Sequence, residues 1–453
     1  MLDFEPSMTC NIKKIIKRDG NTVRYDRDRI STAIFRAMVS AGCPDRDRSE
    51  SLAEKVEAAL VAAYGADAIP SVEEIQDIVQ RTLIDAGEAG TADAYIAYRN
   101  ARSRERSRRA SNFEVTDNIP YKKIYEVLRW NMNHGCDSVP NLNRLIAEGR
   151  FPSLVKESDR RFEEEIASCA AKVLARAGKA RIVFIAGPSS SGKTTTTCKL
   201  AERLRKAGLG LKAINIDNYF FDLETHPRDQ FGDYNYEEPR SLDLPLINRH
   251  LGALLAGETV RAPRYDFKSG KRTLDAVELR LEKDELLLID SLHGLFGDMS
   301  KDVPDNAKFR IYIETLGQLR SEEGVFMRWA DNRLMRRMIR DSLHRNSQPM
   351  DTLTHWHYVR RSELKNIIPF IKTVDFVLNS ALPYEIPILK ARLMHYFPKG
   401  MKEFRKDPHR QDAYLRAKRI FEFLEPLSEF GDDSVVPADS LLREFIGGSR
   451  YPV

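Results

Sequence analysis

The fold is decided by Arg181-Ile-Val-Phe-Ile-Ala186 and the residues that follow it, Gly187-Pro-Ser-Ser-Ser-Gly-Lys-Thr194. The first six residues predict a short apolar strand, and Thr195–Lys206, with apolar residues at helical spacing, predicts a helix that ends before Gly208. Two glycines let the intervening backbone turn its N–H groups inward, where the helix N-terminus and Lys193 add positive charge. This G-x-x-x-x-G-K-[ST] stretch therefore predicts a loop that binds the phosphates of a nucleoside triphosphate. Its candidate ATP-binding residues are Gly187, Ser189, Ser190, Ser191, Gly192, Lys193, Thr194 and Thr195.

Two aspartates follow predicted strands elsewhere in the chain. Asp217 follows Leu211–Ile216, and Asp290 follows the apolar run Leu286–Ile289. Ligands of a doubly wound parallel sheet lie outside the carboxyl ends of its strands, so both carboxylates should meet the phosphate loop. We expect one of the two carboxylates to help the Thr194 hydroxyl hold Mg²⁺, and the other to accept the proton of an attacking hydroxyl. The alternative, that each aspartate caps the element after it, stays open.

Arginines recur at helical spacing further along, as Arg333-Leu-Met-Arg336-Arg337-Met-Ile-Arg340. The spacing predicts one cationic helical face with apolar residues behind it. Taken alone, such a face is usually solvated. Beside a phosphate loop it is typical of a mobile helix that covers the transferring phosphoryl group and excludes water.

Several segments occur in an order that resembles the uridine kinase and phosphoribulokinase family of P-loop kinases. They are the phosphate loop, Asp217-Asn-Tyr-Phe220, Asn235-Tyr-Glu237-Glu-Pro239, Arg264-Tyr265-Asp266-Phe267, the arginine helix and the closing Leu441-Leu-Arg-Glu-Phe-Ile-Gly-Gly-Ser449. The resemblance implies transfer of the ATP γ-phosphoryl group to a nucleoside 5′-hydroxyl, with Mg²⁺ as cofactor.

The same resemblance implies roles for individual residues. Asp217 takes the position of the general base and acts with Lys193, and Asp290 takes the Mg²⁺ side together with Thr194. Tyr219, Glu237 and Tyr265 are candidates for binding the acceptor, and Arg333, Arg336, Arg337 and Arg340 are candidates for the lid.

The sequence departs from the family pattern at two places. Asp290-Ser291 stands where the family commonly has Glu-Gly, and Lys268-Ser-Gly270-Lys stands where uridine–cytidine kinases have a base-contacting histidine. The base preference is therefore open. Because the same fold serves other acceptors, a sugar phosphate or a pantothenate-like alcohol is an alternative substrate.

The first hundred residues predict a separate hairpin-plus-helices unit. The strands Ile12–Ile16 and Thr22–Tyr25 flank the turn Asp19-Gly-Asn21, and helical patterns follow at 28–41, 48–64, 72–86 and 91–109. A set of segments resembles, in order, the ATP-cone, a nucleotide-sensing domain: Lys17-Arg-Asp-Gly20, Asp26, Arg29-Ile30, Val72–Val79 and Tyr95-Ile-Ala-Tyr98-Arg99. The resemblance and the convergence of cations beside a glycine turn suggest an ATP or dATP effector at Lys17, Arg18, Asp26 and Arg29. A small helical domain with a solvated basic hairpin is the alternative.

These patterns predict a three-part α/β chain of 453 residues. Residues 1–110 would form the small, mainly helical ATP-cone with its β-hairpin, and residues 111–180 a helical connector. Residues 181–453 would form a P-loop nucleoside kinase domain with a doubly wound parallel sheet and C-terminal helices. With 42% hydrophobic residues, the chain can build a core in each domain.

Composition constrains partners and location. The sequence shows neither eighteen consecutive apolar residues nor a signal-peptide pattern, so we expect a cytoplasmic homo-oligomer that does not contact membranes. Five cysteines without C-x-x-C spacing indicate neither a disulfide framework nor a zinc ribbon. The net charge is only +5, and the six arginines of Arg99–Arg109 are typical of a solvated helix end. A nucleotide-sensing regulator that binds nucleic acid is the competing hypothesis.

Overall fold

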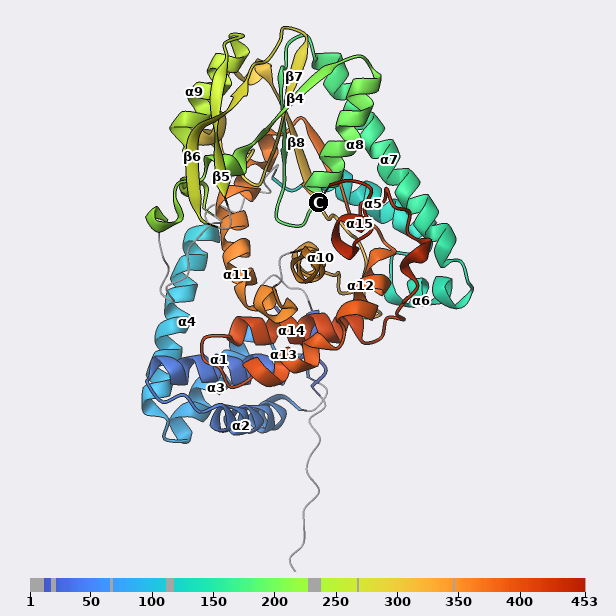
Figure 1. The fold of residues 1–453 in the computed structure, drawn as a ribbon. Coiled ribbons are helices and arrows are strands. Elements are labelled where there is room, and N and C mark those ends of the chain that lie inside the picture. The colour runs from blue at the N-terminus through green and yellow to red at the C-terminus, as the bar shows by residue number, and fades with distance from the viewer. Residues whose placement is uncertain are drawn as a thin grey trace, which may run out of the picture. The chain divides into compact units, whose positions relative to one another are not determined.

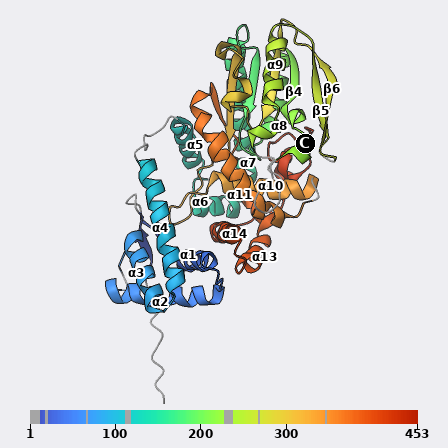
Figure 2. The same cartoon turned by 90° about the vertical axis from the view of Figure 1, so that its left-hand side faces the viewer.

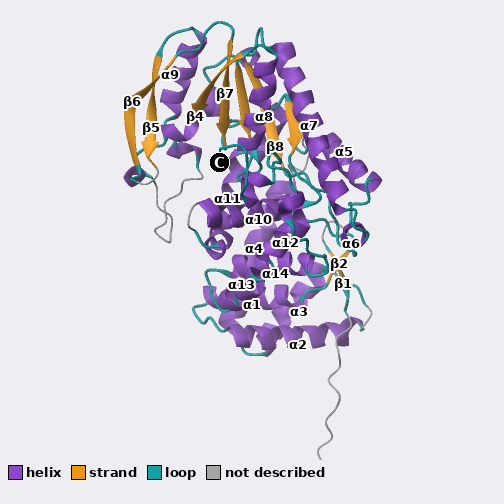
Figure 3. Cartoon of the chain, turned by 45° about the vertical axis from the view of Figure 1, so that its right-hand side comes forward, coloured by secondary structure: helices purple, strands orange, loops and turns teal. Residues whose placement is uncertain are grey.

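The computed structural model describes residues 12–17, 22–65, 68–110, 118–226, 238–266, 269–344 and 347–452 (Figure 1). The chain divides into two compact units. The first comprises Met1–Val115 and Met401–Leu415, and the second comprises Thr116–Gly400 and Arg416–Val453. Helices predominate, and strands occur in both units (Figure 3).

The first unit is a strand pair followed by helices. Strand β1 (Lys14–Ile16) pairs antiparallel with β2 (Thr22–Arg24). The helices are α1 (Arg27–Ser40), α2 (Arg46–Tyr64), α3 (Val72–Asp85) and α4 (Ala89–Ala110). Ser71 and Glu74 form a capping box at the start of α3, because each side chain accepts a hydrogen bond from the other residue's backbone N–H. Apolar residues from the helices, such as Ile34, Leu52 and Leu83, are buried together in this unit's core.

Residues 401–415 join this first unit, although the sequence predicted a kinase domain extending over 181–453. They include the end of α13 (Tyr396–Phe404) and the start of α14 (Gln411–Leu424). The buried Arg46 guanidinium donates to Gln411 Oε1 at 3.2 Å and lies 5.3 Å from the Tyr414 ring. The Tyr414 hydroxyl donates to Asp28 Oδ2 at 3.0 Å. Residues distant in sequence therefore complete this unit through buried polar contacts.

The second unit is built on a five-stranded parallel sheet of order β4-β7-β3-β8-β9. Its strands are β3 (Ile182–Ala186), β4 (Gly210–Asn215), β7 (Glu285–Ser291), β8 (Lys308–Glu314) and β9 (Phe376–Asn379). Helices α7 (Phe151–Arg176) and α8 (Lys193–Lys206) lie on one side of the sheet, and α9 (Leu244–Leu255) lies on the other (Figure 1). The predicted fold class, a doubly wound parallel sheet preceded by a small, mainly helical domain with a β-hairpin, is confirmed.

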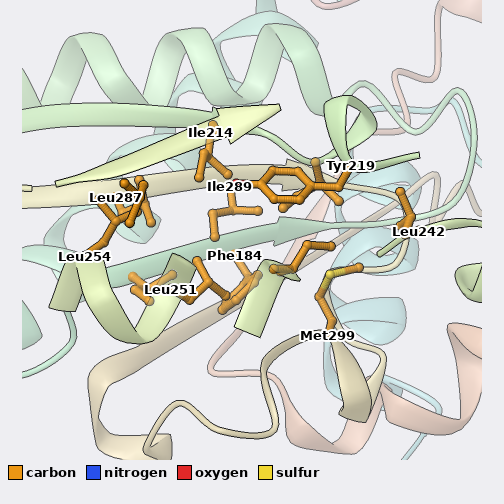
Figure 4. Close-up of a cluster of buried hydrophobic side chains, with 14 of the residues drawn as sticks. Phe184, Ile214, Tyr219, Leu242, Leu251, Leu254, Leu287, Ile289 and Met299 are labelled. Carbon is orange, nitrogen blue, oxygen red and sulfur yellow. The ribbon is translucent and has the colours of Figure 1, made fainter. Parts of the chain in front are cut away.

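Alternation along the strands gives this sheet its two cores. Phe184 and Ile289 pack with Leu251 and Leu254 of α9 (Figure 4). Because successive strand residues point to opposite faces, Val183 and Ile185 face the α8 side, where they are also fully buried. A strand in a sheet that is covered on both faces has apolar residues at successive positions, and this is why β3 could be recognised from the sequence.

The remaining elements surround this sheet. The antiparallel hairpin of β5 (Val260–Asp266) and β6 (Lys271–Leu279) lies beside α9 (Figure 2). The other helices are α5 (Tyr121–Asn133), α6 (Val139–Ala147), α10 (Trp329–His344), α11 (Pro349–Asn366), α12 (Glu385–Leu393) and α15 (Arg443–Ile446). The segment predicted as a connector, 111–180, thus contributes α5, α6 and α7 to the second unit. Among the described residues, none of the helices combines the length and apolarity needed to span a bilayer.

Candidate active site

The phosphate loop joins the carboxyl end of β3 to the first turn of α8. Gly192 has φ +87° and Ser190 has φ 60°, so the loop twice enters the left-handed region. A Cβ atom on Gly187 would lie 2.3 Å from the backbone oxygen of Ile313 in β8, so only glycine fits there. The Lys193 ammonium donates to the carbonyl oxygens of Gly187 at 3.1 Å and Pro188 at 3.3 Å. The lysine is thereby held over its own loop.

Two hydroxyls in this loop and helix start are suited to a polar ligand. Ser191 Oγ and Thr195 Oγ1 are buried and have no hydrogen-bond partner among the residues that the structure describes. Buried polar atoms normally form hydrogen bonds. Two buried hydroxyls that lack such bonds at a helix N-terminus therefore indicate a place where the oxygens of a ligand fit. The first N–H groups of α8 also lie at this end of the helix, and they have no acceptor within the helix. These residues fit a nucleotide triphosphate chain.

Asp290 lies near the end of β7, beside the end of β3 at which the phosphate loop begins. It is opposite Ile185 of β3 on one side and Asn215 of β4 on the other. Burial raises the pKa of Asp290 to about 6, Glu444 and Asp217 add to the rise, and Lys193 and Arg340 oppose it. Because β7 continues to Ser291, Asp290 is a strand residue, and the helix-capping alternative does not apply to it.

Asp217 lies two residues beyond the end of β4, in the short 3₁₀ turn Ile216–Tyr219. The cap of this turn is Asn215, whose side chain accepts a hydrogen bond from the Asp217 N–H at 2.9 Å. The Asp217 side chain is exposed, yet its charge acts on Asp290. The two carboxylates and the loop thus occupy one edge of the sheet, as predicted from the strand ends.

The donor set at this edge fits a magnesium ion. Thr194, half-buried in the first turn of α8, offers a hydroxyl, and Asp290 offers a carboxylate. Within the described part of the chain, His, Cys, Asp and Glu nowhere form a group of three or more that could hold a metal by themselves. Magnesium commonly takes one or two carboxylates and completes its shell with phosphate oxygens and waters, so the residue types at Thr194 and Asp290 fit such an ion.

The arginine helix is α10, and the structure divides its predicted cationic face. Arg333 is fully buried: its Nε lies 2.7 Å from Glu314 Oε1 and its NH1 lies 2.5 Å from Glu363 Oε1. Arg336 is also fully buried, with Nε 2.6 Å from Glu385 Oε2. The prediction of one mobile face of four arginines is corrected here, because β8, α11 and α12 supply carboxylates that the helix's own turns do not show.

The other two arginines face the phosphate loop through side-chain hydroxyls. Arg337 NH1 donates to Ser189 Oγ at 3.1 Å, and Arg340 NH2 donates to Ser190 Oγ at 3.2 Å. Both guanidinium groups remain partly exposed. The buried pair also touches the loop, since Arg333 NH1 donates to the Ser189 carbonyl at 3.1 Å. Helix α10 therefore contacts the loop directly. Of the four arginines predicted to form a lid, Arg337 and Arg340 are the two that remain partly exposed beside the loop hydroxyls.

The acceptor candidates have separate outcomes. Tyr219 is 1% exposed in the core cluster, and its hydroxyl lies 2.8 Å from His250 Nδ1, so it serves packing instead of lining a pocket (Figure 4). The motif placed Tyr219 close to Asp217 in sequence, but the 3₁₀ turn rotates its side chain inward. Tyr265 is 6% exposed, and its backbone N–H donates to Asn218 Oδ1 at 3.2 Å, next to Asp217. Glu237 lies outside the described residues.

Sequence reasoning missed four glutamates of this region. They are Glu314, Glu363, Glu385 and Glu444, each at most 5% exposed in the side chain. Glu314 had a recognisable signal, because it ends the apolar strand β8 just as Asp290 comes near the end of β7. Glu444 lies within the closing segment Leu441–Ser449 that carries part of the family resemblance, but no role of its own follows from the sequence. Glu363 and Glu385 lie on helices, where a single glutamate has no distinctive pattern.

The candidate effector residues of the first unit lie at the hairpin and at the start of α1. Asp26 is the N-cap of α1, since its side chain accepts a hydrogen bond from the Asp28 N–H at 3.1 Å. Arg29 Nε lies 3.4 Å from Asp26 Oδ2. Lys17 is exposed directly after β1, and Arg18 lies outside the described residues.

Comparison with known proteins agrees with this geometry. Residues 13–104 match the ATP cone domain, and residues 182–384 match the phosphoribulokinase / uridine kinase family. A uridine kinase from Deinococcus deserti is 27% identical over 198 residues, which are 44% of this chain and 86% of that protein. A uridine kinase from Halobacterium salinarum is 29% identical over 37% of this chain and 64% of its own length. A uridine kinase from Staphylococcus aureus (strain Newman) is also 29% identical, over 44% of this chain and 86% of its own length. The chain therefore carries an ATP-cone domain and a P-loop kinase domain of the phosphoribulokinase / uridine kinase family.

Proposed function

We propose that this kinase transfers the γ-phosphoryl group of ATP to the 5′-hydroxyl of a nucleoside of the uridine or cytidine kind. The observation that carries the proposal is the meeting of the phosphate loop, Asp290 and Asp217 at one edge of the sheet. The relatives named uridine kinase support the acceptor class.

The loop would bind the triphosphate chain through its inward N–H groups and Lys193. Thr194 and Asp290 would hold Mg²⁺, which when bound neutralises charge on the phosphates. Arg337 and Arg340 already contact the loop hydroxyls and would face the transferring group. In phosphoryl transfer, most of the catalysis comes from such positioning and charge stabilisation.

Asp217 would accept the proton of the attacking hydroxyl. Its side chain is exposed, and its charge contributes to the raised pKa of Asp290, which supports a position close to the proposed magnesium ligand. Tyr265 and Glu237 are proposed to contact the acceptor, Tyr265 because its backbone is bonded to the residue after Asp217.

A screen of the full chain against all ribo- and deoxynucleosides with ATP and Mg²⁺ tests the acceptor. Asp217→Asn should reduce turnover by about 10²-fold or more while leaving ATP affinity largely intact, because a general base acts only after binding. Asp284→Asn is the matched control, since Asp284 is an exposed carboxylate in the turn directly before β7, at the end of that strand away from the phosphate loop. Retained turnover in the Asp217 variant would place the base elsewhere, and activity only on sugar phosphates would replace the acceptor.

We further propose that the ATP-cone adjusts kinase activity in response to ATP or dATP. The chain supports such coupling by connectivity, because α13 and α14 each begin in one unit and end in the other. Residues Gln411 and Tyr414 of α14 bond within the cone unit, and Arg419 of the same helix pairs with Asp331 of α10 at 2.7 Å.

Titration of dATP and ATP against the activity of the full chain tests this regulation, with Lys17→Ala and Arg29→Ala as variants of the effector site. A response in the wild type that both variants weaken supports it. A rate that ignores dATP at every concentration rules it out. Point variants are preferable to deletion of the cone, because deletion would strip Arg405 and Tyr414 of their partners Glu50 and Asp28.

A further inference from the structure

The C-terminal segment reaches into the phosphate loop. Glu444 of α15 is 1% exposed, and its Oε2 accepts a hydrogen bond from the Thr195 N–H at 3.0 Å. Leu441 packs on the same turn, since a Cβ atom added to Gly192 would lie 2.6 Å from Leu441 Cδ1. The segment 440–446 therefore covers the first turn of α8 with one carboxylate and one apolar side chain.

The Thr195 N–H is a group that a nucleotide would need. It belongs to the first turn of α8, whose N–H groups have no intrahelical acceptor, and in a phosphate loop such groups bind phosphate oxygens. A carboxylate already bonded to this donor carries the same sign of charge as a phosphate. The two anions cannot share one donor, because at such short range their repulsion is strong in a partly buried site.

We propose that Glu444 acts as an internal phosphate mimic and that residues 440–446 form an autoinhibitory latch, which a nucleotide must displace to occupy the loop. The inference rests on the proposed nucleotide-dependent function and adds its regulation. Release of the latch also changes α10, because Arg340 NH1 lies 3.7 Å from Glu444 Oε1. Once Glu444 leaves, Arg340 loses an internal anion and becomes available to the phosphates.

The latch is fastened on both sides of Glu444. On one side, the Ser440 hydroxyl lies 2.9 Å from Asp159 Oδ1 and 2.7 Å from the Tyr384 hydroxyl. On the other side, Arg450 NH2 lies 3.1 Å from Glu202 Oε1 on α8. Between these fastenings, Gly447 and Gly448 have φ of +89° and +76°. Displacement of Glu444 must therefore loosen the bonds at both ends of 440–452, and two glycines in the left-handed region give this segment a point at which its backbone can turn.

Calorimetric titration with ATP and with a non-hydrolysable ATP analogue, in the presence of Mg²⁺, measures the competition without an acceptor. Glu444→Gln keeps the size of the side chain and removes its charge, so it should bind either nucleotide about tenfold more tightly than the wild type or better. Glu164→Gln is the matched control, because Glu164 forms an exposed pair with Arg160 on α7 and should leave affinity unchanged.

Hydrogen exchange of the wild-type chain gives a second measurement that needs no variant. Saturating ATP should increase exchange in 440–452 while it protects the loop 187–195. If the nucleotide binds with equal affinity to the wild type and Glu444→Gln, and 440–452 stays protected, Glu444 is only a cap of α8 and the latch is overturned. If neither protein binds nucleotide, the loop is not a nucleotide site, and the proposed function falls together with the latch.

Discussion

Replacement of Arg333 by Met should destabilise the kinase unit far more than replacement by Met of an arginine whose ion pair is partly exposed. The Arg333 side chain is 1% exposed between Glu314 at 5% and Glu363 at 2%. Met retains much of the aliphatic stem but leaves two buried carboxylates without this cation. Breaking a buried ion pair on one side costs about 3–5 kcal/mol, so the free energy of unfolding should fall by that amount.

Arg337→Met provides the matched control on the same helix. Its side chain is 21% exposed, and its partner Asp341 is one helical turn away at 3.2 Å. Arg337 is partly exposed, and the buried Asp341 keeps its hydrogen bond from the Thr352 hydroxyl, so the free energy of unfolding should fall by only about 1 kcal/mol. Turnover should fall in this variant, because Arg337 contacts the phosphate-loop hydroxyl of Ser189.

Urea unfolding followed by tryptophan fluorescence measures the difference. Trp356 is 1% exposed and its ring lies 5.7 Å from the Arg333 guanidinium, so it reports on this part of the kinase unit. A double-mutant cycle with Glu363→Gln isolates the pair, with an expected coupling of about 2 kcal/mol. If Arg333→Met lies within about 1 kcal/mol of the wild type but loses turnover, Arg333 is a lid cation and the structural assignment is wrong.

Three further changes test other parts of the structure. Gly187→Ala would place Cβ 2.3 Å from the Ile313 backbone oxygen, which the sheet holds in place, so ATP affinity and Tm should both fall. Tyr219→Phe should cost about 1 kcal/mol through the lost bond to His250 and leave the KM for the acceptor unchanged. Burial raises the pKa of Asp159 to about 6 from 3.8, so the folded state binds its proton more tightly than the unfolded state does. This contribution to stability is complete below about pH 4 and is lost as pH rises through about 6, by roughly 3 kcal/mol, and Asp159→Asn should remove the dependence.

Each of these outcomes has a clear opposite. Unchanged ATP affinity in Gly187→Ala, measured by calorimetry, would mean that the loop can move away from β8. A raised acceptor KM in Tyr219→Phe would return this hydroxyl to the acceptor pocket. For Asp159, the difference in unfolding free energy between wild type and Asp159→Asn is followed from pH 4 to pH 7, and a flat difference contradicts the predicted sign.

The sequence by itself determined the phosphate loop, the parallel sheet and the place of both aspartates. These features are local: the loop needs glycines and a lysine at fixed spacing, and a buried strand reads as an apolar run. The rule that parallel strands present their carboxyl ends at one edge then brings Asp217 and Asp290 to the loop without knowledge of the packing. The capping box of α3 is local in the same way, since Ser71 and Glu74 are three residues apart.

Only the tertiary structure decided which arginines are free to act, where the cone unit ends and what covers the loop. Arg333 finds its carboxylates 19 and 30 residues away, and Arg336 finds its own 49 residues away. Arg46 meets Gln411 across 365 positions, and the Thr195 N–H meets Glu444 across 249. A charged side chain on a helix gives the same local pattern whether it is solvated or buried. Its burial depends on a partner brought by the packing of another element, and no spacing within its own helix records that partner.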